Sequence, residues 1–134
     1  MIRKINAFSV ILLITIIGCG GGKNEGMISE DKILQASVKE FGELYSHFQK
    51  EQKRPAKNAN ELVRLYGPAY PSGETLPGRP DWMIAWGSNL PAENLTAIFA
   101  YSKNHKDGDP VLMGDGKLKN ISVAEFESAT KLVK

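Results

Sequence analysis

The stretch that decides the fold is SEDKILQASVKEFGELYSHFQKEQK, residues 29–53. Its apolar residues recur at steps of four and three, a spacing that places them on one stripe of an α-helix. Ser29 can cap the first turn, and the two acids after it lie where the helix dipole favours negative charge. Pro55 ends the helix, since the residue before a proline is biased away from helical geometry. We therefore predict a long amphipathic helix over residues 29–53, with a buried stripe of Leu34, Val38, Phe41, Tyr45 and Phe48 flanked by Ile33 and Leu44.

A second, short helix is predicted over residues 58–66. Asn58 can cap it, Glu61 stands three residues later, and Gly67 is a natural stop. Residues 67–81 then hold four prolines and three glycines, a composition that predicts a surface loop without regular structure.

The second half of the chain predicts strands. Residues 82–86 alternate large and smaller side chains, as expected when one face of a strand is buried. Residues 95–101 are apolar on both faces, which is typical of a central strand. Asp115-Gly116 stands between the runs 111–114 and 117–121, which is a strong hairpin signal.

A last helix is predicted near the C-terminus. Ser122 and Glu125 have the spacing of a capping box, and the helix they open would place Val123, Phe126, Thr130 and Val133 on its inner side. Together these elements predict one α+β domain over residues 29–134. It consists of a long N-terminal helix packed on a small antiparallel sheet of about four strands, with a short C-terminal helix.

The N-terminal sequence predicts that the chain is exported, and we do not expect this segment to be part of the folded domain. Arg3 and Lys4 precede an apolar run over residues 5–17, which Gly18 and Cys19 close. A cationic start, a short apolar middle and small residues at the end are the plan of a secretory signal peptide. The run has about 13 residues, whereas a membrane-spanning helix needs about 20.

The segment Ile16-Ile17-Gly18-Cys19 resembles a bacterial lipobox, the signal for lipidation and for cleavage just before the cysteine. The resemblance implies a signal peptide over residues 1–18, lipidation of Cys19, and a flexible tether over residues 19–28. Cys19 is the only cysteine of the 134 residues, and a lone cysteine in an exported chain calls for an explanation. An uncleaved anchor is disfavoured by the length of the apolar run and by the glycines at 20–22, and plain secretion leaves Cys19 unexplained.

The charge balance bears on the partners. Cleavage before Cys19 would remove two of the 17 basic residues and none of the 15 acidic ones, which leaves the mature chain formally neutral. Capture of nucleic acid needs a clustered basic face, so we do not expect a nucleic-acid partner. We expect the chain to contact a cell membrane or outer membrane through its N-terminal lipid. The domain would face the periplasm or the exterior and bind another envelope protein.

A second resemblance lies near the hairpin. His105 is followed by nine residues and then by Asp115-Gly116, which resembles the H-X9-DG motif of prepilin-type envelope proteins. The long helix, the proline after it and Asn60-Glu61-Leu62 resemble the corresponding part of pseudopilins. The resemblance implies a pilin-like globular head. It does not imply a filament, because prepilins begin with a processing site and a long apolar assembly helix, whereas this chain has the lipobox.

Candidate metal ligands gather in the same segment. Asp107 and Asp109 lie near His105 in sequence, and Asp115 would join them if the chain folds back. Calcium prefers such oxygen ligands, and some pseudopilins bind calcium in a similar loop. The spacing differs from that of an EF-hand, so a solvated acidic turn is the alternative. We therefore predict no cofactor, with calcium as the exception to be tested.

Other chemistry has little support in the sequence. There is no Gly-x-Ser-x-Gly, no phosphate-binding glycine loop after a strand, and no cysteine nucleophile once Cys19 is lipidated. Trp82, Trp86 and Tyr101 could form a platform for a glycan, but residues of this size more often fill a core. His47 is expected to be half-exposed beside the helix stripe.

Three hypotheses follow. The first is a non-enzymatic envelope lipoprotein, accessory to a secretion or pilus-like assembly, with residues 67–81 as its partner-facing surface. The second is a small ligand- or calcium-binding module that uses residues 105–115. The third is a small hydrolase, which requires His105 and Asp115 to be adjacent beside a deep pocket.

Overall fold

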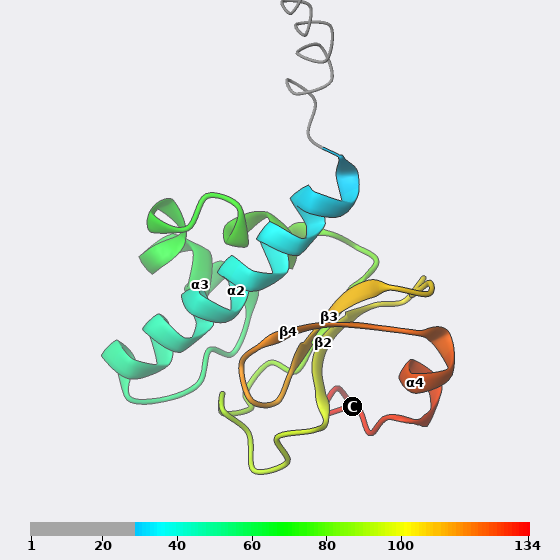
Figure 1. Cartoon of the computed structure of the whole chain (residues 1–134). Helices are drawn as coiled ribbons and strands as arrows, with labels where there is room; N and C mark the ends of the chain where they lie inside the picture. Colours follow the sequence, from blue (N-terminus) through cyan, green and yellow to red (C-terminus); the bar gives the residue numbers. More distant parts are fainter. Residues whose placement is uncertain (1–28) are drawn as a thin grey trace, which may run out of the picture. The chain divides into compact units, whose positions relative to one another are not determined.

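The computed structural model describes residues 29–134, and residues 31–134 form one compact unit. The predicted signal peptide, Cys19 and the predicted tether lie outside the described residues. The predicted α+β class is confirmed, with a long helix, a four-stranded antiparallel sheet in the order β1-β2-β3-β4, and a short C-terminal helix (Figure 1). The elements are α2 (Glu30–Gln52), α3 (Ala59–Tyr66), the 3-10 helices η1 (Gly67–Ala69) and η2 (Gly73–Gly78), β1 (Trp82–Ile84), β2 (Ile98–Ser102), β3 (Asp109–Met113), β4 (Leu118–Ile121) and α4 (Val123–Ser128).

Helix α2 buries the predicted stripe. Its central apolar side chains are completely buried, whereas Leu34 is half-buried and Ile33 is 50% exposed. Gly42 lies where α2 meets the β3–β4 hairpin. A Cβ atom at Gly42 would come within 3.0 Å of the Leu112 side chain and 3.2 Å of the Gly116 carbonyl. A glycine inside a helix weakens it relative to alanine, and the close packing here explains why position 42 is a glycine.

Tyr45 lies at the centre of the main core. Its ring meets that of Phe99 edge-to-face at 4.9 Å. Its hydroxyl donates to the Ser88 carbonyl at 2.7 Å and lies 3.3 Å from the Ala56 carbonyl, so a fully buried phenol keeps its hydrogen bonds. Burial raises the pKa of Tyr45 to about 12. This one side chain joins α2 to the segments that follow α2 and β1.

The sheet carries a core on each face. The face toward α2 contributes Trp82, Ile84, Phe99 and Leu112 to the main core. The other face carries a smaller core of Ile98, Val111 and Ile121, against which residues of α4 pack.

Two boundaries differ from the prediction: β1 ends at Ile84 rather than at residue 86, and β2 begins at Ile98 rather than at residue 95. Leu95 is 52% exposed.

The segment over residues 67–81 is more regular than predicted. It contains η1 and η2, and it is attached to α2 through the Glu40 carboxylate, which accepts from the backbone N–H groups of Ser72 at 3.1 Å and Gly73 at 3.3 Å. Leu76 is completely buried. The prediction of a loop without regular structure was wrong, because these contacts with α2 hold a glycine- and proline-rich chain in tight turns.

The C-terminal segment also differs from the prediction. The capping box of Ser122 and Glu125 is present, but α4 ends at Ser128 instead of reaching residue 133. The chain then extends beside β2, where Ile98 donates to the Thr130 carbonyl at 2.8 Å and accepts from the Leu132 N–H at 2.9 Å. The last residues therefore pair with the sheet.

A capped junction joins α2 to α3. Glu61 forms an ion pair with Arg54 and accepts from the Lys57 N–H at 2.7 Å, while Asn58 caps α3 by accepting from the Glu61 N–H at 2.9 Å. The Arg54 guanidinium and then the Lys57 N–H lower the pKa of Glu61 from 4.5 to about 2.

Gly73→Ala should destabilise the fold. The new Cβ atom would come within 2.7 Å of the Glu40 carbonyl carbon and 2.8 Å of the Phe41 nitrogen, both of which are backbone atoms of α2. We expect a loss of about 2 kcal/mol or more in the free energy of unfolding, measured by urea denaturation. Gly78→Ala is the matched control in the same segment, because nothing lies within 4 Å of its new Cβ atom. Equal effects of the two variants would contradict the packing of η2 on α2.

Glu61 should make stability depend on pH in the acid range. The pKa of Glu61 is lower in the fold than in the unfolded chain, so its stabilising contribution is full above pH 4.5 and is lost as pH falls toward about 2. Urea denaturation of the wild type and Glu61→Gln at several pH values should show a difference that shrinks below pH 4.5. A difference that stays constant with pH would refute this role.

Candidate functional site

The histidine of the H-X9-DG motif attaches the β2–β3 loop to the end of β4. His105 Nε2 lies 3.0 Å from the Ile121 carbonyl oxygen. Because a carbonyl only accepts, Nε2 carries a proton and donates in this contact. Its Nδ1 is buried and has no hydrogen-bond partner among the described residues. The position of the histidine suits a structural contact between the loop and the hairpin.

Phe126 of α4 forms the other half of this contact. The rings of His105 and Phe126 stack at 4.5 Å with 9° between their planes, and Tyr101 meets Phe126 edge-to-face at 5.2 Å. The Lys131 ammonium lies 4.3 Å from the centre of the Phe126 ring and donates to the Ala129 carbonyl at 3.1 Å. This arrangement, the His105–Phe126 cluster, holds α4 against the second face of the sheet.

The three aspartates proposed as metal ligands are not brought together. Asp109 pairs with Ile121 at one end of the hairpin, whereas Asp115 lies in the turn at the other end. The intervening β3 spans roughly 13 Å at about 3.3 Å per residue. The prediction that Asp115 folds back near His105 was therefore wrong. The hydrolase hypothesis loses the adjacency that it requires.

Each of these carboxylates accepts a backbone N–H instead. Asp107 accepts from Val123 at 2.7 Å, Asp109 from Lys106 at 2.9 Å, and Asp115 from Lys117 at 2.9 Å. Within residues 29–134 no three histidine, cysteine or acidic side chains are grouped in a way that could hold a metal ion. The observed chemistry of the three aspartates is to stabilise turns and the start of α4. Gly116 serves the same hairpin, since its φ of +85° suits a glycine.

The aromatic residues considered as a glycan platform lie in different layers. Trp82 is 7% exposed in the main core, and Trp86 packs against Phe41 with ring centres 6.1 Å apart. Tyr101 contacts Phe126 on the opposite face of the sheet. The expectation that these residues fill cores is confirmed for the tryptophans. His47 is half-buried as expected, with Nδ1 3.1 Å from the Tyr70 hydroxyl.

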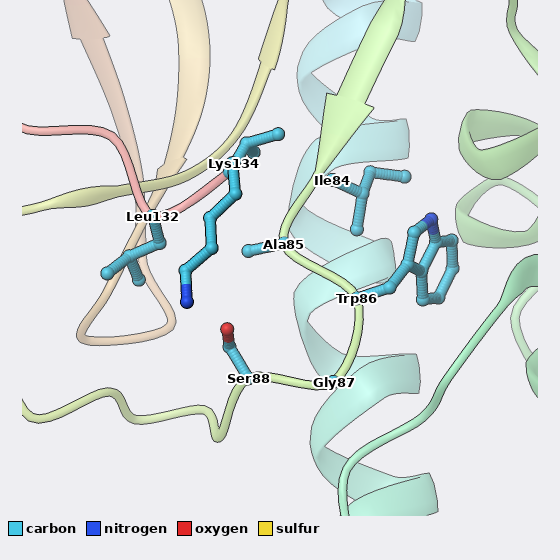
Figure 2. A pocket seen from close by; sticks show the side chains of 8 residues that line it. Ile84, Ala85, Trp86, Gly87, Ser88, Leu132 and Lys134 are labelled. Atoms are coloured by element: carbon cyan, nitrogen blue, oxygen red, sulfur yellow. The ribbon is translucent and has the colours of Figure 1, made fainter.

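One cavity of about 310 Å³ lies between the chain that leaves β1 and the C-terminal segment. Figure 2 shows the Lys134 amino group reaching toward the Ser88 hydroxyl, with Leu132 and Ala85 beside them and Trp86 turned away. The described lining has no histidine, aspartate or glutamate side chain, and the basic group beside Ser88 is the Lys134 amine. The cavity could hold a small molecule with an apolar part and a polar group.

Two further grooves adjoin β4, one on each face of the sheet. The α4-side groove, about 210 Å³ in volume, is lined by Leu95, Thr96, Met113, Asp115, Lys119, Ile121, Glu125 and Ala129. The α2-side groove, about 400 Å³ in volume, is lined by Lys39, Glu43, Gly116, Lys117 and Leu118. The sequence prediction missed both grooves. A signal for the first was Leu95, a large apolar residue between Asn94 and Thr96.

His105→Phe should separate the two contacts of the histidine, its ring stacking on Phe126 and its hydrogen bond to Ile121. Phenylalanine keeps a ring to stack on Phe126 but removes the hydrogen bond to Ile121, so we expect a loss of about 1 kcal/mol in the free energy of unfolding. His105→Ala removes both contacts and should cost more. Nitrogen-15 NMR of the wild type should show a proton on Nε2 of His105. A protonated Nδ1 in the neutral ring would contradict the observed contact.

The comparisons with other proteins leave the chain without a matched relative. No protein-family model, curated protein or solved structure matches it. Within the described part of the chain, no helix has both the length and the apolar character that crossing a membrane requires. The guide to function is therefore the chemistry of the chain's own residues.

Proposed function

We propose that this chain is a lipid-anchored, non-enzymatic binding protein of the bacterial cell envelope, accessory to a secretion or pilus-like assembly. The observation that carries the proposal is the N-terminal sequence. A cationic start, a short apolar run and Ile16-Ile17-Gly18-Cys19 together fit a lipoprotein signal. Cys19 has no other cysteine to pair with, and acylation of its sulfur accounts for it.

The polar side chains of the head support a binding role. His105 bonds to the Ile121 carbonyl, and Asp107 and Asp109 accept backbone N–H groups. General acid–base chemistry needs such groups directed at a substrate, close to a cavity that excludes water. Here they hold a loop, a turn and the start of a helix. Recognition by surface shape and charge is the function that this arrangement favours.

The layout of the head supports the pilin-like part of the proposal. A long N-terminal helix packs along one face of a four-stranded antiparallel sheet, which is the arrangement that the resemblance implies. The apolar stripe of α2 is buried within its own domain. We therefore propose an accessory protein that presents this head near a membrane, rather than a filament subunit.

The calcium-binding alternative is not carried forward. It depended on Asp107, Asp109 and Asp115 gathering around one ion, and the hairpin places Asp115 at the opposite end of β3 from Asp109.

Cys19→Ser should abolish acylation. Expressed in bacteria with radiolabelled palmitate, the wild-type protein should carry the label and sediment with membranes until detergent is added. Cys19→Ser should carry no label, because it removes the only sulfhydryl group in the chain. Ser29→Ala, outside the lipobox, is the matched control and should behave as the wild type does. Label on the Cys19→Ser protein, or an unlabelled wild type, would refute the proposed anchor.

A further inference from the structure

We propose that β4 is a docking edge for an extended segment of a partner protein, in which acidic and apolar side chains alternate. The strand order is β1-β2-β3-β4, so β4 pairs with β3 on one side and with no described strand on the other. Figure 1 shows β4, in orange, leading from the hairpin turn to α4. An edge of this kind can accept another strand through its backbone.

The register shows which backbone groups face outward. Met113 donates to the Lys117 carbonyl at 2.9 Å across the hairpin, and bonded pairs alternate with non-bonded pairs in an antiparallel ladder. Lys119 and Ile121 therefore bond to β3. Leu118 and Asn120 direct their N–H and C=O groups away from β3, where the described residues offer them no partner. These groups match the spacing of a strand added beside β4.

The two grooves adjoin β4, one on each face of the sheet. Side chains alternate between the two faces of a sheet, so successive residues of an added strand would point toward the α2 side and the α4 side. Leu118 lines the α2-side groove, and Lys119 and Ile121 line the α4-side groove. Backbone bonding together with a groove on each face is how strand addition achieves both affinity and specificity.

The charged and apolar residues that line the two grooves determine which partner side chains fit them. The α2-side groove contains two lysines, Lys39 and Lys117, and one acid, Glu43, which favours an acidic side chain. The α4-side groove has four apolar residues, which favour an apolar side chain, and two acids with one lysine, which disfavour an acidic side chain there: Leu95, Met113, Ile121 and Ala129, then Asp115, Glu125 and Lys119. The matching segment therefore alternates acidic and apolar residues.

A second copy of this chain is a poor occupant of the edge. In the antiparallel register that pairs the outward Leu118 of one copy with the outward Asn120 of the other, Lys119 stands opposite Lys119. Like charges directly opposite each other destabilise a strand pair, and lysines on edge strands oppose self-association. The same lysines leave the edge open to a partner of opposite charge.

This inference rests on the proposed binding role and names the kind of partner. It does not depend on the lipid, because docking on β4 involves only the head. A failure to bind would leave acylation of Cys19 intact, and a failure of acylation would leave binding intact.

The test uses the full chain in detergent and a fluorescent peptide of about eight alternating Glu and Val residues, long enough to pass β4. We expect saturable binding by fluorescence anisotropy, and no binding of the Lys/Val peptide of equal length. Asn120→Pro removes an outward N–H but no bond to β3, so it should weaken binding about fivefold or more relative to Asn120→Ala. Asn120→Ala is the matched control, because both variants lose the side-chain bond to the Gly108 carbonyl.

Hydrogen exchange of the wild type provides a second measurement that needs no variant. The peptide should slow exchange at the amides of Leu118 and Asn120. Unchanged exchange at both amides would overturn the proposal, as would equal affinities of Asn120→Pro and Asn120→Ala. Dimerisation of the free chain through β4, detected by analytical ultracentrifugation, would overturn the choice of partner.

Discussion

Burial of the apolar stripe of α2 against one face of the sheet is the interaction on which the rest of the structure depends. Tyr45 lies at its centre, packing on Phe99 while its hydroxyl bonds to the Ser88 carbonyl. Gly42 and Gly73 have no side chain where the hairpin and η2 come closest to the helix. The Tyr45 side chain also contacts the loops that follow α2 and β1, through the carbonyls of Ala56 and Ser88. The sheet consequently has a well-covered first face.

The second face of the sheet is covered less completely, and this determines which surfaces remain for binding. α4 is short, and it is held by Phe126 stacked between elements of the loop, the sheet and the C-terminal segment. A groove remains beside it, with Leu95 half-exposed at the rim. This groove and the unpaired side of β4 form the surface that we propose for recognition, whereas the segment over residues 67–81, which the sequence favoured, remains a prediction.

The elements that sequence reasoning predicted are those with strong local signals. The stripe of α2, Asn58 as the cap of α3, Asp115-Gly116 in the hairpin and the Ser122 capping box all depend on residues close together in the chain. The errors concern contacts between distant residues. Glu40 binding the backbone at Ser72 gives no local signal, and neither does the pairing of Ile98 with the C-terminal segment. The separation of Asp115 from His105 follows from the length of β3, which residue spacing within a motif does not reveal. For the same reason the grooves beside β4, which combine α2, the hairpin and α4, could not be predicted.

The proposed lipid anchor accounts for an N-terminal sequence that resembles a lipoprotein signal, and it suits a head in which His105, Asp107 and Asp109 hold the head's own loops. The anchor is the central proposal, because an acylated Cys19 would place the head at a membrane and make an envelope protein its expected partner. The most direct measurement is the intact mass of the protein extracted from bacterial membranes. Our account predicts a chain that begins at Cys19 and carries the added mass of a lipid on that residue. A chain that retains Met1, or a Cys19 with a free thiol, would contradict it.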